Sequence, residues 1–164
     1  MKRRFSLATA AAAATAAALW VAVPAGAATG HQAASGPEKF QVMSTSATST
    51  TASVIASGVF TAGGVDHMGS KVDTLVFSNG SFKVAHSPGT GKPTLNPKTC
   101  LFTATFRGTV ALSGGTGAYK GISGKGTYQF NQLAILAKVG GKCSMKKPPV
   151  AFQALIKASA MVTL

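Results

Sequence analysis

Residues 71–87 read KVDTLVFSNGSFKVAHS, with Asn79-Gly80 between two runs in which apolar and polar residues alternate. An Asn-Gly pair in this setting is the strongest short-range indication of a β-hairpin, because a type I′ turn needs positive φ at both central residues. The stretch therefore predicts two antiparallel strands, residues 71–77 and 81–87.

A two-residue turn at Asn79-Gly80 would place Asp73 directly opposite His86. Both side chains would share a face with two Phe, a Leu and a Val, which predicts that this face points into the interior. A carboxylate beside an imidazole at the mouth of an apolar interior stabilises the charged imidazole and can orient it as a general acid–base group. Asp73 and His86 are therefore the candidate catalytic pair. The alternative is an ordinary cross-strand ion pair where the sheet meets solvent.

The same period of two extends from residue 39 to the C-terminus, and no stretch shows the spacing of an amphipathic helix. Further strands are expected at residues 39–46, 51–60, 100–112, 125–139 and 151–164, with an eighth short strand inside the glycine-rich segment before residue 125. Apolar residues change parity within 125–139, which predicts a bulge near Asn131. Such strands form an antiparallel sandwich or barrel. A barrel is favoured, because it leaves no apolar edge strand exposed.

The first 27 residues have the three parts of an export signal. Basic residues 2–4 precede an apolar run at 7–23, and the small-x-small pattern of a signal peptidase site ends at Ala27. We expect a signal peptide (1–27), a flexible leader (28–38), a single domain (39–164) and secretion to the extracellular space. No later stretch approaches the roughly 18 apolar residues of a membrane-spanning helix, so a transmembrane protein is not expected.

Removal of residues 1–27 leaves 13 basic and three acidic residues, a net charge of +10. Such a charge attracts polyanions. Arg107 is the only arginine left, and the lysines are scattered, whereas nucleic-acid binding favours arginine and basic residues interleaved with aromatics. Nucleic acid is therefore not an expected partner, but anionic wall polymers are.

Two cysteines are present, and in an exported chain they predict a structural disulfide between Cys100 and Cys143. The bridge would close a loop of 43 residues, which contributes about 4 kcal/mol in the chain-entropy model. A redox-active pair is usually close in sequence, as in Cys-x-x-Cys, and this pair is not.

The known catalytic strings are absent: the chain has no Gly-x-Ser-x-Gly, no His-Glu-x-x-His and no Walker loop. Three histidines and three acids are a poor supply for a metal site, so neither a metal nor a cofactor is expected. Besides Asp73, only Asp66 could complete a carboxylate pair for glycoside hydrolysis. Asp66 and His67 precede the hairpin, and the pattern does not fix their direction.

The densest motif is SGGTGAYKGISGKG at residues 113–126, which predicts a tight corner that needs positive φ and close backbone approach. The segment resembles the Gly-Gly-Thr-Gly-x-aromatic-x-Gly stretch of dirigent proteins, and allene oxide cyclase barrels have a similar one. A group of small exported bacterial barrel proteins of unassigned activity is also similar. The residues that carry the resemblance are Gly114, Gly115, Thr116, Gly117, Tyr119 and Gly121.

This resemblance implies an all-β, eight-stranded antiparallel β-barrel with a central pocket, often assembled as a homotrimer. Dirigent proteins steer the coupling of phenoxy radicals, and the cyclases close a ring in a fatty-acid epoxide. The pocket residues of those families have no counterparts that can be placed in this sequence, so neither activity is carried over.

Three functions remain open. The first is a non-catalytic barrel with a pocket for a small apolar or aromatic molecule, since an eight-stranded barrel can hold one small ligand. The second is an enzyme of the cyclase or isomerase type, which would add convergent polar groups deep in the pocket. The third is a wall-associated structural protein with a filled barrel, held by its lysine charge.

Overall fold

The computed structural model describes residues 34–164, and in this part of the chain the regular structure is almost entirely β-strand. The expected signal peptide (1–27) and the beginning of the expected leader lie outside the described residues. The strands are β1 (Ser35–Ser44), β2 (Thr51–Ser57), β3 (Thr61–His67), β4 (Val72–Phe77), β5 (Gly80–His86), β6 (Thr90–Asn96), β7 (Leu101–Ser113), β8 (Ser123–Ile135), β9 (Ala137–Val139), β10 (Lys142–Ser144) and β11 (Ala151–Thr163).

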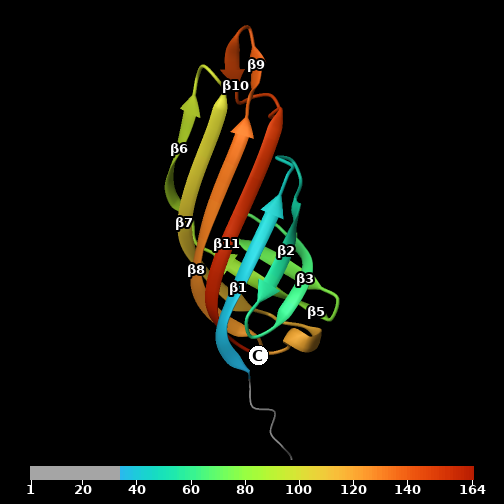
Figure 1. The fold of residues 1–164 in the computed structure, drawn as a ribbon. Helices are drawn as coiled ribbons and strands as arrows, with labels where there is room; N and C mark the ends of the chain where they lie inside the picture. Colours follow the sequence, from blue (N-terminus) through green and yellow to red (C-terminus); the bar gives the residue numbers. More distant parts are fainter. Residues whose placement is uncertain (1–33) are drawn as a thin grey trace, which may run out of the picture. The chain divides into compact units, whose positions relative to one another are not determined.

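Eight of these strands form a closed antiparallel barrel, which confirms the predicted fold (Figure 1). The order around the barrel is β5-β4-β3-β2-β1-β11-β8-β7, and pairing between β5 and β7 closes it. The fully exposed β6 is hydrogen-bonded to the first half of β7, and β9 and β10 form a separate two-stranded hairpin. The apolar terminal strand β11 lies between β1 and β8 and is not an edge, in agreement with the closure argument, whereas β6 has one unpaired edge.

The eighth barrel strand is β3, not a strand within the glycine-rich segment. Gly63 and Gly64 interrupt the apolar alternation there, which hid the strand from the pattern. Gly64 is nevertheless needed, because a Cβ at this position would collide with the carbonyl oxygen of Val76 on β4. The first strand also begins earlier than expected, since β1 pairs with β11 from Ser35 onward, so residues 35–38 are strand and not leader.

The predicted bulge near Asn131 is wrong. The strand β8 pairs without interruption with β11 along its whole length and with β7 from Gly124 to Ile135. The parity change arises because Leu133 and Ile135 lie on the outer face, 52% and 38% exposed, while Phe130 and Ala134 keep the inward parity. Exposed apolar residues on a single strand are ordinary at protein surfaces and do not require a re-phased backbone.

The hairpin formed by β4 and β5 exists, but its register differs from the prediction by two residues. Phe77 pairs with Gly80, so Ser78 and Asn79 form the loop, and neither has positive φ. Gly80 instead begins β5 with φ of 150°, because a Cβ there would collide with the carbonyl oxygen of Thr116. A shift of two preserves parity, and every side chain keeps its predicted face.

The glycine-rich segment packs against this hairpin loop and closes one end of the barrel. The amide of Ala118 donates to the carbonyl of Asn79 (2.9 Å), and the amide of Thr116 donates to that of Ser81 (2.8 Å). Gly117 has φ of 56°, and a Cβ on it would collide with the carbonyl oxygen of Asn79. The expected tight corner is therefore present, and its close approach is to the hairpin loop.

The corner ends in a short 3-10 helix, η1 (Gly117–Tyr119), which delivers Tyr119 into the barrel. Its ring is 2% exposed and lies 4.9 to 5.4 Å, centroid to centroid, from the rings of Phe60, Phe77 and Phe82. Phe40 joins this cluster through Phe60 and Phe82. The aromatic core fills the barrel at the end closed by the glycine-rich segment.

Candidate ligand cavity

Beyond the aromatic core the barrel interior is hollow. A cavity of about 410 Å³ lies among inward-facing side chains of seven barrel strands and the loops that follow β3 and β5. Its wall is mostly apolar, and β1, β7, β8 and β11 contribute most of its aromatic and several of its aliphatic side chains, among them Phe40, Val42, Phe106, Tyr128, Phe130 and Ile156. Period-two alternation produces this wall, because the even-numbered residues of these strands all point inward.

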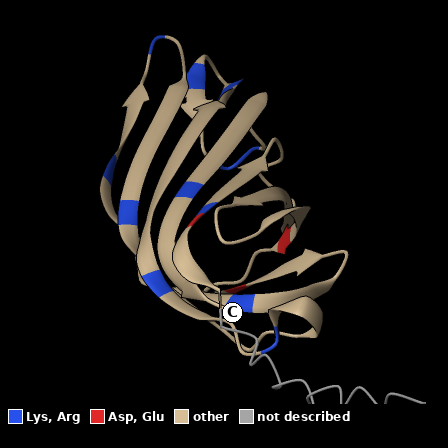
Figure 2. Ribbon diagram, turned by 60° about the horizontal axis from the view of Figure 1, so that its bottom comes forward, with Lys and Arg blue, Asp and Glu red and all other residues tan. Residues whose placement is uncertain are grey.

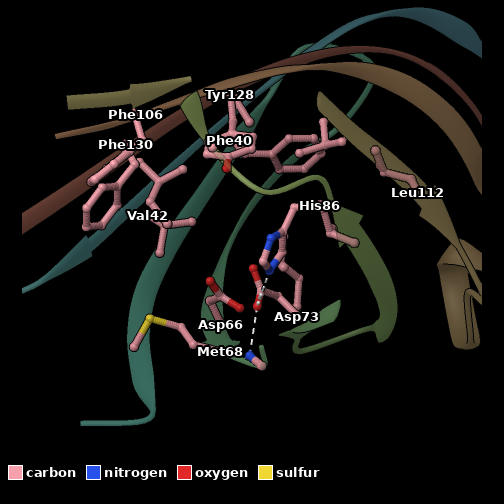
Figure 3. A pocket seen from close by; sticks show the side chains of 17 residues that line it. Phe40, Val42, Asp66, Met68, Asp73, His86, Phe106, Leu112, Tyr128 and Phe130 are labelled. Carbon is pink, nitrogen blue, oxygen red and sulfur yellow. Dashed lines mark hydrogen bonds and ion pairs between the residues drawn. The ribbon is translucent and has the colours of Figure 1, made fainter. Parts of the chain in front are cut away.

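One side of the cavity is polar. The three residues there are Asp66 on β3, Asp73 on β4 and His86 on β5, which Figure 3 shows together across the cavity from aromatic side chains. The antiparallel order β3-β4-β5 brings them together, since the three strands are adjacent in the sheet.

The candidate pair Asp73 and His86 is in contact, although not as directly opposite residues. Asp73 pairs with Val84 in the register, and its Oδ1 lies 3.5 Å from Nε2 of His86, two residues farther along β5 on the same face. The same oxygen accepts a hydrogen bond from the amide of Gly69 (2.8 Å). Both side chains are mostly buried, with 15% exposure for Asp73 and 24% for His86.

The most buried polar group of the cavity is Asp66, whose direction the sequence left open. Its side chain points inward and is 1% exposed, and its Oδ1 has no hydrogen-bond partner. Burial, together with the negative charge of Asp73, raises the pKa of Asp66 to about 7. If the sequence pattern had identified β3 as a strand, it would also have predicted that Asp66 points inward, because the even-numbered residues of β3 face the interior.

Two neighbours of these residues take other roles. His67 follows Asp66 on β3, so its side chain is exposed on the outer face. The hydroxyl of Tyr128 donates to the carbonyl of Ser87 (3.0 Å), and the Tyr128 ring lies edge-on to the His86 ring at 6.2 Å. Tyr128 therefore holds the strand end that carries His86.

Glu38, the third acid of the chain, is also inside the barrel but does not line the cavity. Its side chain is fully buried; Oε2 accepts from the amide of Phe60 (3.0 Å), and Oε1 has no partner. Burial raises the pKa of Glu38. The pKa of Tyr119 is also raised, chiefly by burial and to a smaller extent by the negative charge of Glu38. The sequence placed Glu38 in the leader and so missed it.

Charge is thus divided between the two faces of the barrel. All three acids point inward, whereas the 13 basic residues among residues 34–164 are exposed. Figure 2 shows the basic residues spread over strands and loops. On the outer face, Lys39, Arg107 and Lys157 line one groove that crosses several strands.

The other residues predicted as sites lie away from the cavity. Cys100 and Cys143 form the predicted disulfide, with their Cα atoms 5.3 Å apart, between the start of β7 and β10. The glycine motif lies at the closed end of the barrel, and Tyr119 belongs to the aromatic core there. Neither the disulfide nor the motif lines the cavity.

Among residues 34–164, no group of three or more His, Cys, Asp or Glu side chains is arranged to hold a metal ion. The same part of the chain has no helix long and apolar enough to cross a membrane. Comparison with known proteins identified no relative: no family model matches the chain, and neither a curated protein nor a solved structure is significantly similar to it.

Proposed function

We propose that this protein is a secreted barrel that binds a small apolar or aromatic molecule in its interior. The observation that carries the proposal is the cavity of about 410 Å³. This volume lies within the roughly 300–1,000 Å³ of small-molecule pockets, which are typically apolar with a few polar groups that fix orientation. Secretion, which is part of the proposal, would place the protein in an oxidising compartment, where disulfides such as Cys100–Cys143 persist.

The composition of the wall supports an aromatic ligand. Phe40, Phe106, Phe130 and Tyr128 offer ring faces and edges to a bound molecule, and aromatic pairs add about 0.5–1.5 kcal/mol beyond simple area burial. The barrel topology and the glycine-rich corner agree with the resemblance to dirigent and allene oxide cyclase barrels. That resemblance is part of the proposal and carries neither family's activity.

The proposal is tested with N-phenyl-1-naphthylamine, a neutral probe that fluoresces when it enters an apolar site. Saturable binding is expected. Ala158 on β11 lines the cavity, so Ala158→Leu should fill part of it and weaken binding at least about tenfold. The matched control is Ala151→Leu, the same change at an exposed position of the same strand. Equal affinity of wild type and Ala158→Leu would contradict the proposal.

A second role is favoured by the outer surface, which carries all 13 described basic residues and no exposed acid. We propose that this surface attaches the protein to anionic wall polymers. The groove with Lys39, Arg107 and Lys157 also holds the amide side chains of Gln41 and Gln129, which can hydrogen-bond to phosphate or carboxylate groups. A ligand cavity inside and a cationic surface outside do not compete.

Poly(glycerol phosphate) is a suitable probe for the second role. Replacing Lys39, Arg107 and Lys157 together by Gln should weaken its binding roughly tenfold at low salt, and added salt should weaken the wild-type complex. In the control variant, Gln replaces three exposed lysines of the β9–β10 region: Lys138, Lys142 and Lys146. The two triple variants then have the same net charge. Equal losses in both variants would show attraction by net charge alone and exclude the groove as the site.

A further inference from the structure

We propose that the ligand of the cavity is an amine: an aromatic or apolar body that carries an ammonium group, which Asp66 binds. This inference rests on the proposed function and specifies its ligand class. It follows from the charges of the cavity wall, from the unpartnered oxygen of Asp66 and from the aromatic side chains across from it.

The wall of the cavity has acidic groups and no lysine or arginine. Its titratable side chains are Asp66 on β3, Asp73 on β4, His86 on β5 and Tyr128 on β8, while β1, β7 and β11 contribute only apolar residues. Asp73 is already satisfied by His86 and by the amide of Gly69. Asp66 has neither a cation nor a hydrogen-bond donor on its Oδ1.

A carboxyl group buried in this way is unusual. A buried polar group without a hydrogen-bond partner destabilises a protein, and buried charges are normally paired. Asp66 lines the cavity, so a ligand can reach it and supply the missing partner. An ammonium group donates hydrogen bonds and neutralises charge, whereas a ligand carboxylate would be repelled by both Asp66 and Asp73.

The remaining wall suits the rest of such a molecule. Phe40, Phe106, Phe130 and Tyr128 can pack against an aromatic body, and their ring faces attract a nearby cation. Because the acids lie inside the barrel, the exposed lysines cannot pair with Asp66 and so do not compete with the ammonium group of a ligand. The interior therefore selects for positive charge in a protein whose outer surface is positive.

The affinity for the amine should depend on pH, because binding is coupled to the loss of a proton from Asp66. Since the pKa of Asp66 is raised to about 7, a cation that binds below this pH must displace a proton from the carboxyl group. The affinity should therefore rise about tenfold per pH unit up to about pH 7 and level off above it. Removal of the Asp66 carboxyl should abolish this dependence, even though Asp73 and His86 stay in place.

Calorimetric titration with 2-phenylethylamine, 2-phenylethanol and phenylacetate at about pH 8 tests the inference. The amine should bind roughly ten- to a hundredfold more tightly than the alcohol, and phenylacetate most weakly. In Asp66→Asn, the preference for the amine and its pH dependence should both disappear, while the affinity for the alcohol is retained. Glu38→Gln is the matched control: it removes a buried carboxyl outside the cavity wall and should keep the preference.

Each other outcome has a definite meaning. If the amine binds no more tightly than the alcohol, or if phenylacetate binds best, the inference is overturned and the apolar pocket stands. The same holds if only the neutral naphthylamine probe binds. If neither that probe nor any of the three ligands binds, the proposed function fails together with the inference.

Discussion

Replacing Cys100 and Cys143 by alanine is expected to lower the free energy of unfolding by about 4 kcal/mol. The bridge closes a loop of 43 residues, and without it the unfolded chain gains the corresponding conformational freedom. Few other contacts hold the region. The β9–β10 hairpin pairs only with itself, through strands of three residues each. The double variant should therefore lose the order of this hairpin before that of the barrel.

Urea denaturation measures the total loss, and hydrogen exchange locates it. Amides of β9 and β10 should lose protection in the variant, while those of β1 and β2 in the barrel keep theirs. Binding of the naphthylamine probe serves as a control, since the disulfide belongs to a small cluster with Ala134 and Leu136 that is separate from the main core. A decrease in the free energy of unfolding of less than about 1 kcal/mol would contradict this prediction, because it would show that removing the disulfide adds little conformational entropy to the unfolded chain.

The sequence was sufficient to predict the strands with clean alternation and the closure of the barrel. It was also sufficient to place Asp73 and His86 on one face. Their pairing was predicted two residues out of register, yet the contact forms, because a shift of two leaves both side chains inward. The type I′ turn expected at Asn79-Gly80 does not form, since Gly80 lies against the carbonyl of Thr116. That contact joins residues 36 apart in the sequence, which a local turn rule cannot include.

The most informative site residue was missed for a similar reason. Gly63 and Gly64 remove two side chains from β3, so the alternation that would identify the strand and orient Asp66 is not visible. Glu38 was missed because the residues before it are small and polar, as in a leader, although β11 pairs with them from Ser35 onward. Glu38 is placed by pairing with the distant strand β11, and local pattern carries no information about such pairing.

Inward placement of the acids has a consequence for stability, because a buried carboxyl disfavours its charged form. The wild-type free energy of unfolding should fall as the pH rises from about 4 to about 7, by up to about 4 kcal/mol from Asp66 alone, and should then level off. In this range the unfolded chain has released the Asp66 proton, whereas the folded chain retains it. The folded state therefore binds more protons, and a rising pH disfavours it.

Asp66→Asn should remove this decline and make the protein more stable than wild type at about pH 8, because the neutral amide is never deprotonated. Urea denaturation at about pH 5 and about pH 8 measures the effect. Asp73→Asn is the informative companion: burial is the larger cause of the shift and the charge of Asp73 the smaller, so this variant should reduce the decline only in part. Glu38 has a raised pKa as well and contributes a decline of the same sign, which persists in both variants. Parallel pH profiles for wild type and Asp66→Asn would mean that Asp66 is hydrated in solution, and the carboxyl would then lose its role as the unpaired group that recognises an amine.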